Sequence, residues 1–381
     1  MWSFARKILM HDKVKFAVAA AGVSMSVMLV LVQIGLYLGF MENASNLIDH
    51  STADVWVTGE GNENFDFAAP MDERVYYRIA STPGVDRAER VVLAFGQFRL
   101  ASGGNQGVEV VGLERDAELL SPWNVVGGDV RRIHEVDGIA VDRSELPKLG
   151  LDGADGGASP GLGARNEITG FRSRIVAMTS GIRSFTTSPF VFTNLETARA
   201  YTRTRDDRIT YVLVRRAPGT SVDALVARLD RIPGVEAHAR PSFSTRTRDY
   251  WSSRTGVGTG FFMTAVMGVI VGLVVVGQIL YSGTLEHLKE YGTLKAMGAK
   301  AGAIVRVILY QALISALVGY VIGGGLSFLV REGVRAAALN VVLSPNLLAS
   351  TAVLTAVMCS AAAILSIVKV LRLDPASVFK G

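Results

Sequence analysis

Residues 255–285 read TGVGTGFFMTAVMGVIVGLVVVGQILYSGTL, a run of 31 side chains without a charge. About 20 mainly apolar residues are enough for a helix to cross the hydrocarbon core of a bilayer. Three further uncharged runs, at residues 16–41, 307–330 and 336–368, are 26, 24 and 33 residues long. The sequence therefore predicts four transmembrane helices.

The boundaries of the parts follow from these runs. The first run is too long for the apolar core of a signal peptide, so we read it as an uncleaved anchor. Ser344 followed by Pro345 predicts an N-cap and a first-turn proline, so the last helix is expected to begin at residue 345. The basic and aromatic residues at 1–15 predict an amphipathic leader on the inner membrane surface, or an irregular basic one. The helices are then residues 16–41, 255–285, 303–330 and 345–371, and the other parts are a large domain at 42–254, a short connection at 286–300, an outer loop at 331–344 and a tail at 372–381.

The charge distribution predicts the orientation. Residues 1–15, 286–306 and 369–381 together hold 11 basic and 4 acidic residues, whereas residues 42–254 hold 26 basic and 29 acidic ones. Basic residues concentrate on the cytoplasmic side of a membrane protein. We therefore expect both termini in the cytoplasm and the large domain outside, and we read the net charge of +5 as a record of topology, not of nucleic-acid binding.

Residues 42–254 show a mixed α/β pattern with a weak internal repeat. Residues 77–85 and 227–235 each read as a helix, a Pro-Gly-Val turn and a strand, which predicts two α/β units flanking an insertion, or two copies of a common turn. The glycine-rich stretch 149–170 is expected to be a flexible loop, since a calcium loop needs a denser set of oxygen ligands. Strands are predicted at 53–58, 97–101, 107–112 and 209–214, and helices at 71–81, 194–203 and 221–231.

The usual catalytic signatures are absent. The sequence has no phosphate-binding G-x-x-x-x-G-K-[ST], no H-E-x-x-H and no G-x-S-x-G. One cysteine, Cys359, excludes an intramolecular disulfide and a cysteine-based zinc site. His134, Glu135 and Asp137 are better explained as surface charge than as a metal site. We expect no catalytic residue, no metal and no enzyme activity on this chain.

The uncharged runs contain no Asp, Glu, Lys, Arg or His side chain, which disfavours an ion-coupled transporter, although an ion site built from backbone groups stays open. In three pairs of glycines the second glycine follows the first by four residues, a spacing that lets helices approach closely. Each pair suits packing within the chain or a seam between two copies. The pairs are Gly35 and Gly39, Gly268 and Gly272, and Gly319 and Gly323.

The connection at 286–300 carries apolar residues every third position, with charges between them. A helix with this pattern lies on lipid or against a partner protein. The residues that we assign to such a contact are Glu286, His287, Lys289, Glu290, Tyr291, Gly292, Thr293, Leu294, Lys295, Met297 and Gly298.

Residues 290–299, EYGTLKAMGA, resemble the E-[IY]-G-T-L-[KR]-A-[ML]-G motif of FtsX/MacB-type ABC transporter permeases. The order of the parts and the closing LDPASVF at 373–379 are similar to that family as well. Within it, Tyr250-Trp251 and the stretches 256–258, 267–272 and 278–281 look most like the DevC subgroup. The similarity covers residues 1–60 and 248–381, and the middle of the large domain is similar only in size and α/β character.

The resemblance implies a MacB/FtsX-like permease of type VII ABC architecture in a bacterial inner membrane, with a periplasmic domain. It implies a homodimer joined to a separate cytoplasmic ABC ATPase, which would hold ATP and magnesium, with residues 286–298 as the coupling helix. DevC-like members are similar to exporters that work with a membrane-fusion adaptor and an outer-membrane channel. We therefore expect export of lipid-like or amphipathic cargo, with lipid around the spans. An FtsX-type signal relay and lipoprotein extraction are the alternatives, and an unrelated receptor is disfavoured because no cytoplasmic output domain is evident.

Overall fold

The computed structural model describes residues 12–151, 161–186, 188–297, 299–335 and 340–371 of the chain. The chain divides into two compact units. Residues 1–39 and 257–381 form the membrane unit, and residues 40–256 form the large domain. Each unit has its own hydrophobic core, so each is described by itself.

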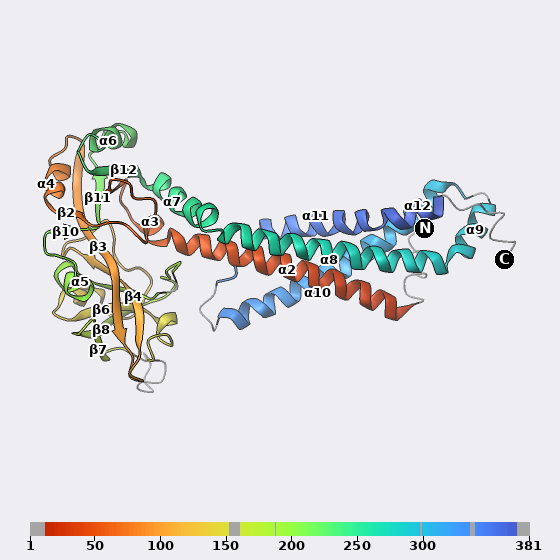
Figure 1. Cartoon of the computed structure of the whole chain (residues 1–381), viewed down its shortest axis with the longest axis horizontal. Helices are drawn as coiled ribbons and strands as arrows, with labels where there is room; N and C mark the ends of the chain where they lie inside the picture. Colours follow the sequence, from red (N-terminus) through yellow and green to blue (C-terminus); the bar gives the residue numbers. More distant parts are fainter. Residues whose placement is uncertain (1–11, 152–160, 187, 298, 336–339, 372–381) are drawn as a thin grey trace. The chain divides into compact units, whose positions relative to one another are not determined.

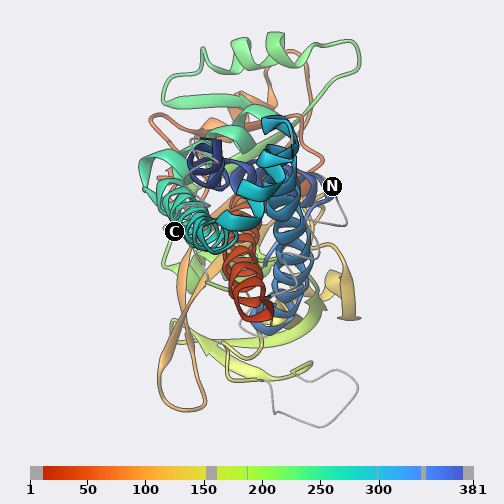
Figure 2. The same cartoon turned by 90° about the vertical axis from the view of Figure 1, so that its right-hand side faces the viewer.

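The membrane unit is helical (Figure 1). Four spans in the described part of the chain are long and apolar enough to cross a membrane. Figure 2 views these helices end-on, with the first span between the second and the third. The helices are α2 (Lys13–Ala44), α8 (Val257–Glu286), α9 (Leu288–Ala296), α10 (Ala301–Arg335), α11 (Pro345–Ala362) and α12 (Ile364–Leu371).

The helix bounds differ from the sequence-based ones in several places. Helix α2 begins at Lys13, inside the predicted leader, and α10 continues to Arg335, inside the predicted outer loop, because a helix does not stop at the first charged side chain. Helix α8 begins at Val257 because Gly256 before it has a φ of 76°. The fourth span has the expected bounds, 345–371, but consists of α11 and α12. The leader residues 1–11, residues 336–339 and the tail 372–381 lie outside the described residues.

A four-stranded antiparallel layer forms one end of the sheet in the large domain, in the order β12-β1-β11-β3. Its strands and helices follow the chain as β1 (Val55–Gly59), α4 (Arg74–Ala80), β3 (Val85–Arg99), β11 (Tyr211–Arg216), α6 (Val222–Leu229) and β12 (Val235–Ala239). This β-α-β-β-α-β order is that of a ferredoxin-like split unit. Ile79 of α4 and Leu225 of α6 belong to one buried cluster with Val55 and Val212, so both helices cover the same face of the layer.

The predicted repeat of two α/β units around an insertion is confirmed. In both units a helix is followed by Pro-Gly, and the next strand begins at Val85 or Val235. The two glycines, Gly84 and Gly234, have φ values of 99° and 83°, which glycine adopts most readily. The predicted helix at 71–81 is wrong at its start. Residues 71–72 form the short strand β2 (Met71–Asp72), because they pair with β10 (Arg208–Ile209).

The insertion continues the sheet beyond β3. Its elements are β4 (Asn105–Leu113), β5 (Val125–Gly128), η1 (Val130–His134), β6 (Gly138–Asp142), η2 (Arg143–Glu145), β7 (Arg165–Ile168), β8 (Phe171–Thr179), β9 (Phe190–Asn194) and α5 (Leu195–Thr202). The strands follow β3 in the order β4-β9-β6-β8-β5, and β7 pairs with β3 and β8.

The prediction of a flexible loop at 149–170 is wrong for its last part. Residues 165–168 form β7 and pair with β8 in a hairpin. Thr169 and Gly170 at the turn both have positive φ, as the two-residue type I′ turn requires. Residues 152–160 of this stretch lie outside the described residues.

Candidate functional site

The connection between the second and third spans contains a separate short helix, α9. Helix α8 ends at Glu286, and α9 begins two residues later at Leu288. Tyr291 anchors α9, because its side chain is only 1% exposed and packs in the cluster that holds Ile304 and Val370. Burial raises the pKa of Tyr291 to about 12, and a hydrogen bond with Gln311 acts in the opposite direction. One side of α9 is thus attached to the membrane unit.

The other side of α9 is not covered by the described residues of the chain. The side chains of Glu290 and Met297 are 53% and 72% exposed, and Thr293 is exposed as well. Glu290 lies 3.0 Å from Nδ1 of His287, and Nζ of Lys295 donates to the carbonyl of Leu371 at 3.5 Å. This outer side of the helix can therefore contact a partner without unfolding the membrane unit.

Most of the residues assigned to this contact lie on α9 or at its ends. Glu286 ends α8, where it pairs with Lys15 of α2. Gly292 is buried beside Tyr291. The side chains of Lys289 and Leu294, and all of Gly298, lie outside the described residues.

Two of the glycine pairs bring other helices onto α2. A Cβ added at Gly319 of α10 would lie 2.4 Å from Cβ of Val23, and one at Gly323 would lie 2.5 Å from the carbonyl oxygen of Ser24. On α8, a Cβ added at Gly272 would lie 2.7 Å from Ser26, and one at Gly268 would lie 3.1 Å from Leu29. Ser26 also donates to the carbonyl of Gly268 at 2.8 Å. Both pairs therefore allow close approach within one chain.

The third glycine pair lies on α2. A Cβ added at Gly35 would lie 2.7 Å from Val341, and one at Gly39 would lie 1.9 Å from the carbonyl oxygen of Asn340. The backbone N–H of Val342 donates to the carbonyl of Gly35 at 3.0 Å. These glycines let the segment before α11 lie directly on the backbone of α2.

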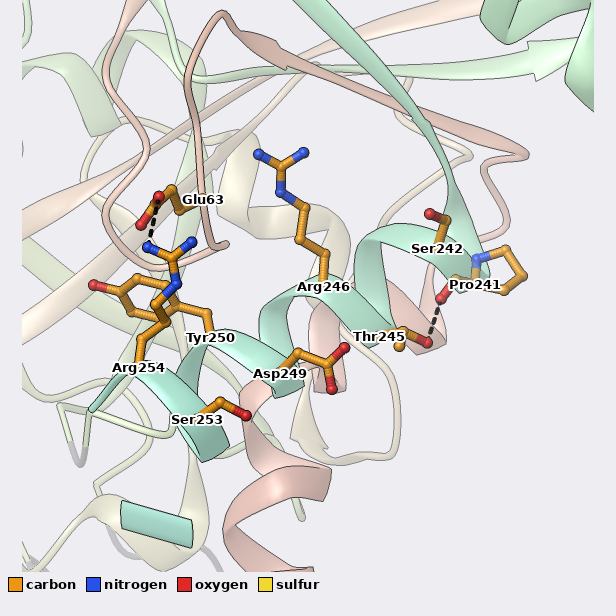
Figure 3. A pocket seen from close by; sticks show the side chains of 9 residues that line it. All are labelled: Glu63, Pro241, Ser242, Thr245, Arg246, Asp249, Tyr250, Ser253 and Arg254. Carbon is orange, nitrogen blue, oxygen red and sulfur yellow. Dashed lines mark hydrogen bonds and ion pairs between the residues drawn. The ribbon is translucent and has the colours of Figure 1, made fainter. Parts of the chain in front are cut away.

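A polar groove of about 740 Å³ follows α7 (Arg240–Asp249) and the π-helical turn η3 (Tyr250–Arg254) in the large domain (Figure 3). Arg254 pairs with Glu63 and Arg246 pairs with Glu236, each at 3.3 Å. Two arginines and two acids, Glu63 and Asp249, line the groove, so their formal charges cancel. The charged residues that line the groove therefore carry no net positive charge that would select an anion.

The charged group at 134–137 does not converge on a point. Glu135 pairs with Arg132 at 2.8 Å and with Arg174 at 2.6 Å. Across the ranges that the structure describes, no three His, Cys, Asp or Glu side chains are grouped so that they could hold a metal ion.

Five acids are buried among the described residues of the large domain, and the sequence patterns predict none of them; Asp66 and Glu109 are two of these. Asp66 is 6% exposed and Glu109 is 1% exposed. Glu109 stands in the run GVEVVG of strand β4, where an acid between valines is the only local signal. Asp66 lies in a stretch without regular structure and gives no signal of its own.

The comparisons with known families match both parts of the chain. Residues 16–232 match the MacB-like periplasmic core domain, and residues 262–375 match the FtsX-like permease C-terminal region. The first match covers more than half of the chain.

Two relatives with similar sequences are named as ABC transporter permeases. An uncharacterized ABC transporter permease of Mycobacterium tuberculosis (strain H37Rv) is 24% identical over 294 residues, which are 77% of this chain and 75% of that protein. Another, from Mycobacterium bovis, is 29% identical over 119 residues, which are 31% of this chain. The aligned part spans 33% of the length of that relative.

Two solved structures were also found to be similar. The extracellular domain of the noncanonic ABC-type transporter YknZ from Gram-positive bacteria has a TM-score of 0.35 and 10% identity, covering 49% of this chain and 98% of that one. The periplasmic region of MacB from Actinobacillus actinomycetemcomitans has a TM-score of 0.36 and 9% identity, covering 52% and 94%.

Proposed function

Because the chain belongs to the ABC transporter permeases with a MacB-like periplasmic core domain and an FtsX-like C-terminal region, we propose that it is the membrane subunit of an ATP-driven exporter. A separate ABC ATPase, which binds ATP and magnesium, docks on α9. Closure of the ATPase on ATP shifts α9, and the shift passes along the helices to the large domain.

The observation that carries this proposal is the two-sided character of α9. Tyr291 fixes the helix to the membrane unit, while Glu290 and Met297 on its other side are exposed. A helix held in this way transmits a push from a docked partner, since its buried anchor cannot slide without moving α10. Glu290 supplies a charge for the docking contact, and Met297 an adaptable apolar one.

The docking role is tested by reversing the charge of one exposed residue. Glu290→Lys is expected to reduce co-purification of the ATPase, and the ATPase activity of the complex, by at least tenfold. The variant should fold normally, because the Glu290 side chain is 53% exposed. Glu332→Lys makes the same change near the end of α10 that is remote from α9. It is the matched control, and its binding of the ATPase and its ATPase activity should equal those of the wild type. Unchanged binding and activity in Glu290→Lys would refute the docking role of α9.

The wider assembly is part of the same proposal. Two copies of the chain form the permease, both termini are cytoplasmic, and the large domain contacts a membrane-fusion adaptor that leads to an outer-membrane channel. The excess of basic residues in the short segments supports this orientation. The cargo is lipid-like or amphipathic, since it enters from the bilayer or its outer surface.

The alternative is an FtsX-type relay, in which the same movement of the large domain controls periplasmic enzymes and nothing is exported. The absence of ionisable side chains in the uncharged runs suits both functions, because neither needs a proton or ion path. The two are separated by vanadate-sensitive ATPase activity of the reconstituted complex with and without an adaptor. An exporter responds to the adaptor, and a complex that neither binds it nor changes its activity is not a tripartite exporter.

A further inference from the structure

A second pocket in the large domain has a volume of about 470 Å³ and is lined by residues of two segments, 113–121 and 130–135. The first segment follows strand β4, and the second contains the helical turn η1. The floor of the pocket is apolar and closed, because Leu113, Leu120 and Ile133 are each only 2% exposed. A pocket of this size holds a small molecule, or one end of a larger molecule whose remainder stays outside.

The pocket brings together cationic side chains from both segments. Arg115 comes from the first segment and Arg131 from the second, and both side chains are exposed. His134 lines the same pocket and is half-buried. Burial and the charge of Arg115 lower the pKa of His134, and Asp116 acts in the opposite direction. The imidazole is therefore neutral at pH 7, and the positive charge of the pocket belongs to the two guanidinium groups.

The acids of the two segments are engaged by other arginines. Glu135 lines the pocket, but its carboxylate pairs with Arg132 at 2.8 Å and with Arg174 at 2.6 Å. The ion pairs of the first segment join Glu114 to Arg90 at 2.6 Å, and Glu118 to Arg87 at 3.0 Å and to Arg215 at 3.1 Å. Within the described part of the chain, no ion pair neutralises Arg115 or Arg131.

Two further acids neighbour these arginines in the sequence. They are Asp116 and Asp129, and neither of them lines the pocket. Oδ1 of Asp129 accepts the backbone N–H of Arg131 at 2.9 Å, so this carboxylate caps η1 and does not pair with the guanidinium. The two guanidinium groups thus keep their charge at the pocket.

The groove along α7 shows what a neutralised site looks like in the same domain. It is larger, but its two arginines, Arg246 and Arg254, are each paired with a glutamate at 3.3 Å. The smaller pocket is therefore the better of the two for an anion.

The charge and the shape of the pocket indicate the kind of anion. The donor fork of an arginine matches the oxygens of a phosphate or a carboxylate, and two arginines balance the charge of about −1.5 to −2 that a phosphate monoester carries at pH 7. Ala117 and Val130 are only partly buried at the pocket, so they offer a little apolar surface beside the arginines. Nδ1 of His134 is buried and lacks a hydrogen-bond partner among the described residues, which is uncommon for a buried polar atom.

We propose that this pocket binds the head group of an anionic amphipathic molecule, a phosphate monoester held between Arg115 and Arg131. The first carbon atoms of the molecule lie on Ala117 and Val130, and its acyl chains stay outside because the floor is closed. This inference rests on the proposed export function, and it narrows the cargo to amphiphiles with a negatively charged head group.

The test is calorimetric titration of the full-length protein, in nanodiscs of phosphatidylcholine, with dihexanoyl phosphatidic acid. Empty nanodiscs give the background. Saturable binding is expected, and Arg115→Gln and Arg131→Gln should each weaken it at least tenfold, because each variant loses charge-assisted hydrogen bonds. Both side chains are exposed, so neither change should alter the thermal stability. Arg172→Gln, at an exposed arginine of β8 outside the pocket, is the matched control and should bind as the wild type does.

Two other probes define the selectivity. Dihexanoyl phosphatidylcholine, which has no net charge, and inorganic phosphate, which has no carbon atoms, should both bind more weakly than the phosphatidic acid. Equal affinity for the choline ester would show that charge is not selected, and equal affinity for phosphate would show a site for the free ion; either result would overturn the proposal. Absence of saturable binding, or unchanged binding in either arginine variant, would overturn it as well.

The titration needs neither ATP nor the ATPase. A failure to bind the phosphatidic acid therefore leaves the export function standing, and a complex that does not export leaves the binding result standing.

Discussion

The contact between α2 and α10 can be tested with one methyl group. A Cβ added at Gly323 would lie 2.5 Å from the carbonyl oxygen of Ser24 and 2.9 Å from Cβ of Val27. Gly325 lies on the same helix and has nothing within 4 Å of such a Cβ. Gly323→Ala and Gly325→Ala are therefore a matched pair that differs in the contact with α2.

The size of the effect follows from two opposing terms. Replacing a helical glycine by alanine stabilises a helix by roughly 0.5–1 kcal/mol, and this gain applies to both variants. Forcing an extra methyl group into a packed interior costs about 1–3 kcal/mol. Because the obstacle at Gly323 is a backbone carbonyl, it cannot rotate away as a side chain would. The difference between the two variants isolates the packing cost, so Gly323→Ala should be about 1–3 kcal/mol less stable than Gly325→Ala.

The measurement is thermal unfolding of both full-length variants in lipid vesicles, in which the protein is diluted by lowering the protein-to-lipid ratio. For a unit of this size, 1 kcal/mol corresponds to roughly 2–4 °C in Tm, so Gly323→Ala should melt at least about 2 °C below Gly325→Ala. The deficit should not change when the protein is diluted, because the contact lies within one chain. Equal Tm values would show that α10 does not approach α2 closely. A deficit that grows on dilution would place Gly323 between two copies.

Three further outcomes are expected. Tyr291→Phe should lower the free energy of unfolding by about 1 kcal/mol because the hydroxyl contact is lost. Tyr291→Ala should lower it by about 3–5 kcal/mol and abolish ATPase binding, and equal thermal stability of the two variants would contradict the anchoring of α9. Gly234→Ala should lower the free energy of unfolding by about 1–2 kcal/mol, because residue 234 has a positive φ. Gly84→Ala should lower it more, since the Cβ added at residue 84 would also lie 2.8 Å from Arg228. If Gly84→Ala unfolded at the higher temperature of the two, the turn geometry would be contradicted. The pKa of Glu109 is raised to about 8, so its contribution to stability is fully present below pH 4.5 and is lost as the pH rises to 8. Glu109→Gln should therefore flatten the fall of Tm over this pH range. An unchanged fall of Tm in this variant would contradict the raised pKa.

The parts that the sequence predicts well are those with a local cause. An uncharged run of 24 residues or more is sufficient by itself to indicate a span, and Ser344 and Pro345 locate the start of the last span at residue 345. The side chain of Ser344 does cap the helix, accepting from the N–H of Leu347 at 3.2 Å. The turns at Gly84 and Gly234 were likewise predicted, because Pro-Gly restricts the backbone wherever it occurs.

The parts that it misses depend on contacts between distant residues. Strand β1 lies between β11 and β12, more than 150 residues further along the chain, and no local pattern specifies that order. Asp66 and Glu109 are unremarkable in isolation, and their pKa values are raised only because the fold buries them. The hairpin of β7 was hidden by the glycines around it, although Thr169-Gly170 is itself a recognisable turn.

The occupied glycine pairs restrict how a second copy of the chain can bind. All six glycines already face another segment of the same chain, so a proposed dimer has to use larger apolar side chains. Helix α8 presents such a surface, because Met263, Met267, Ile270 and Val274 are each 48–59% exposed and recur at helical spacing along one side. Helices that meet through side chains of this size lie about 8–10 Å apart, farther than glycine contacts require. A dimer formed in this way can widen or narrow without disturbing the close packing of α2, as the movement proposed for ATP-driven coupling needs.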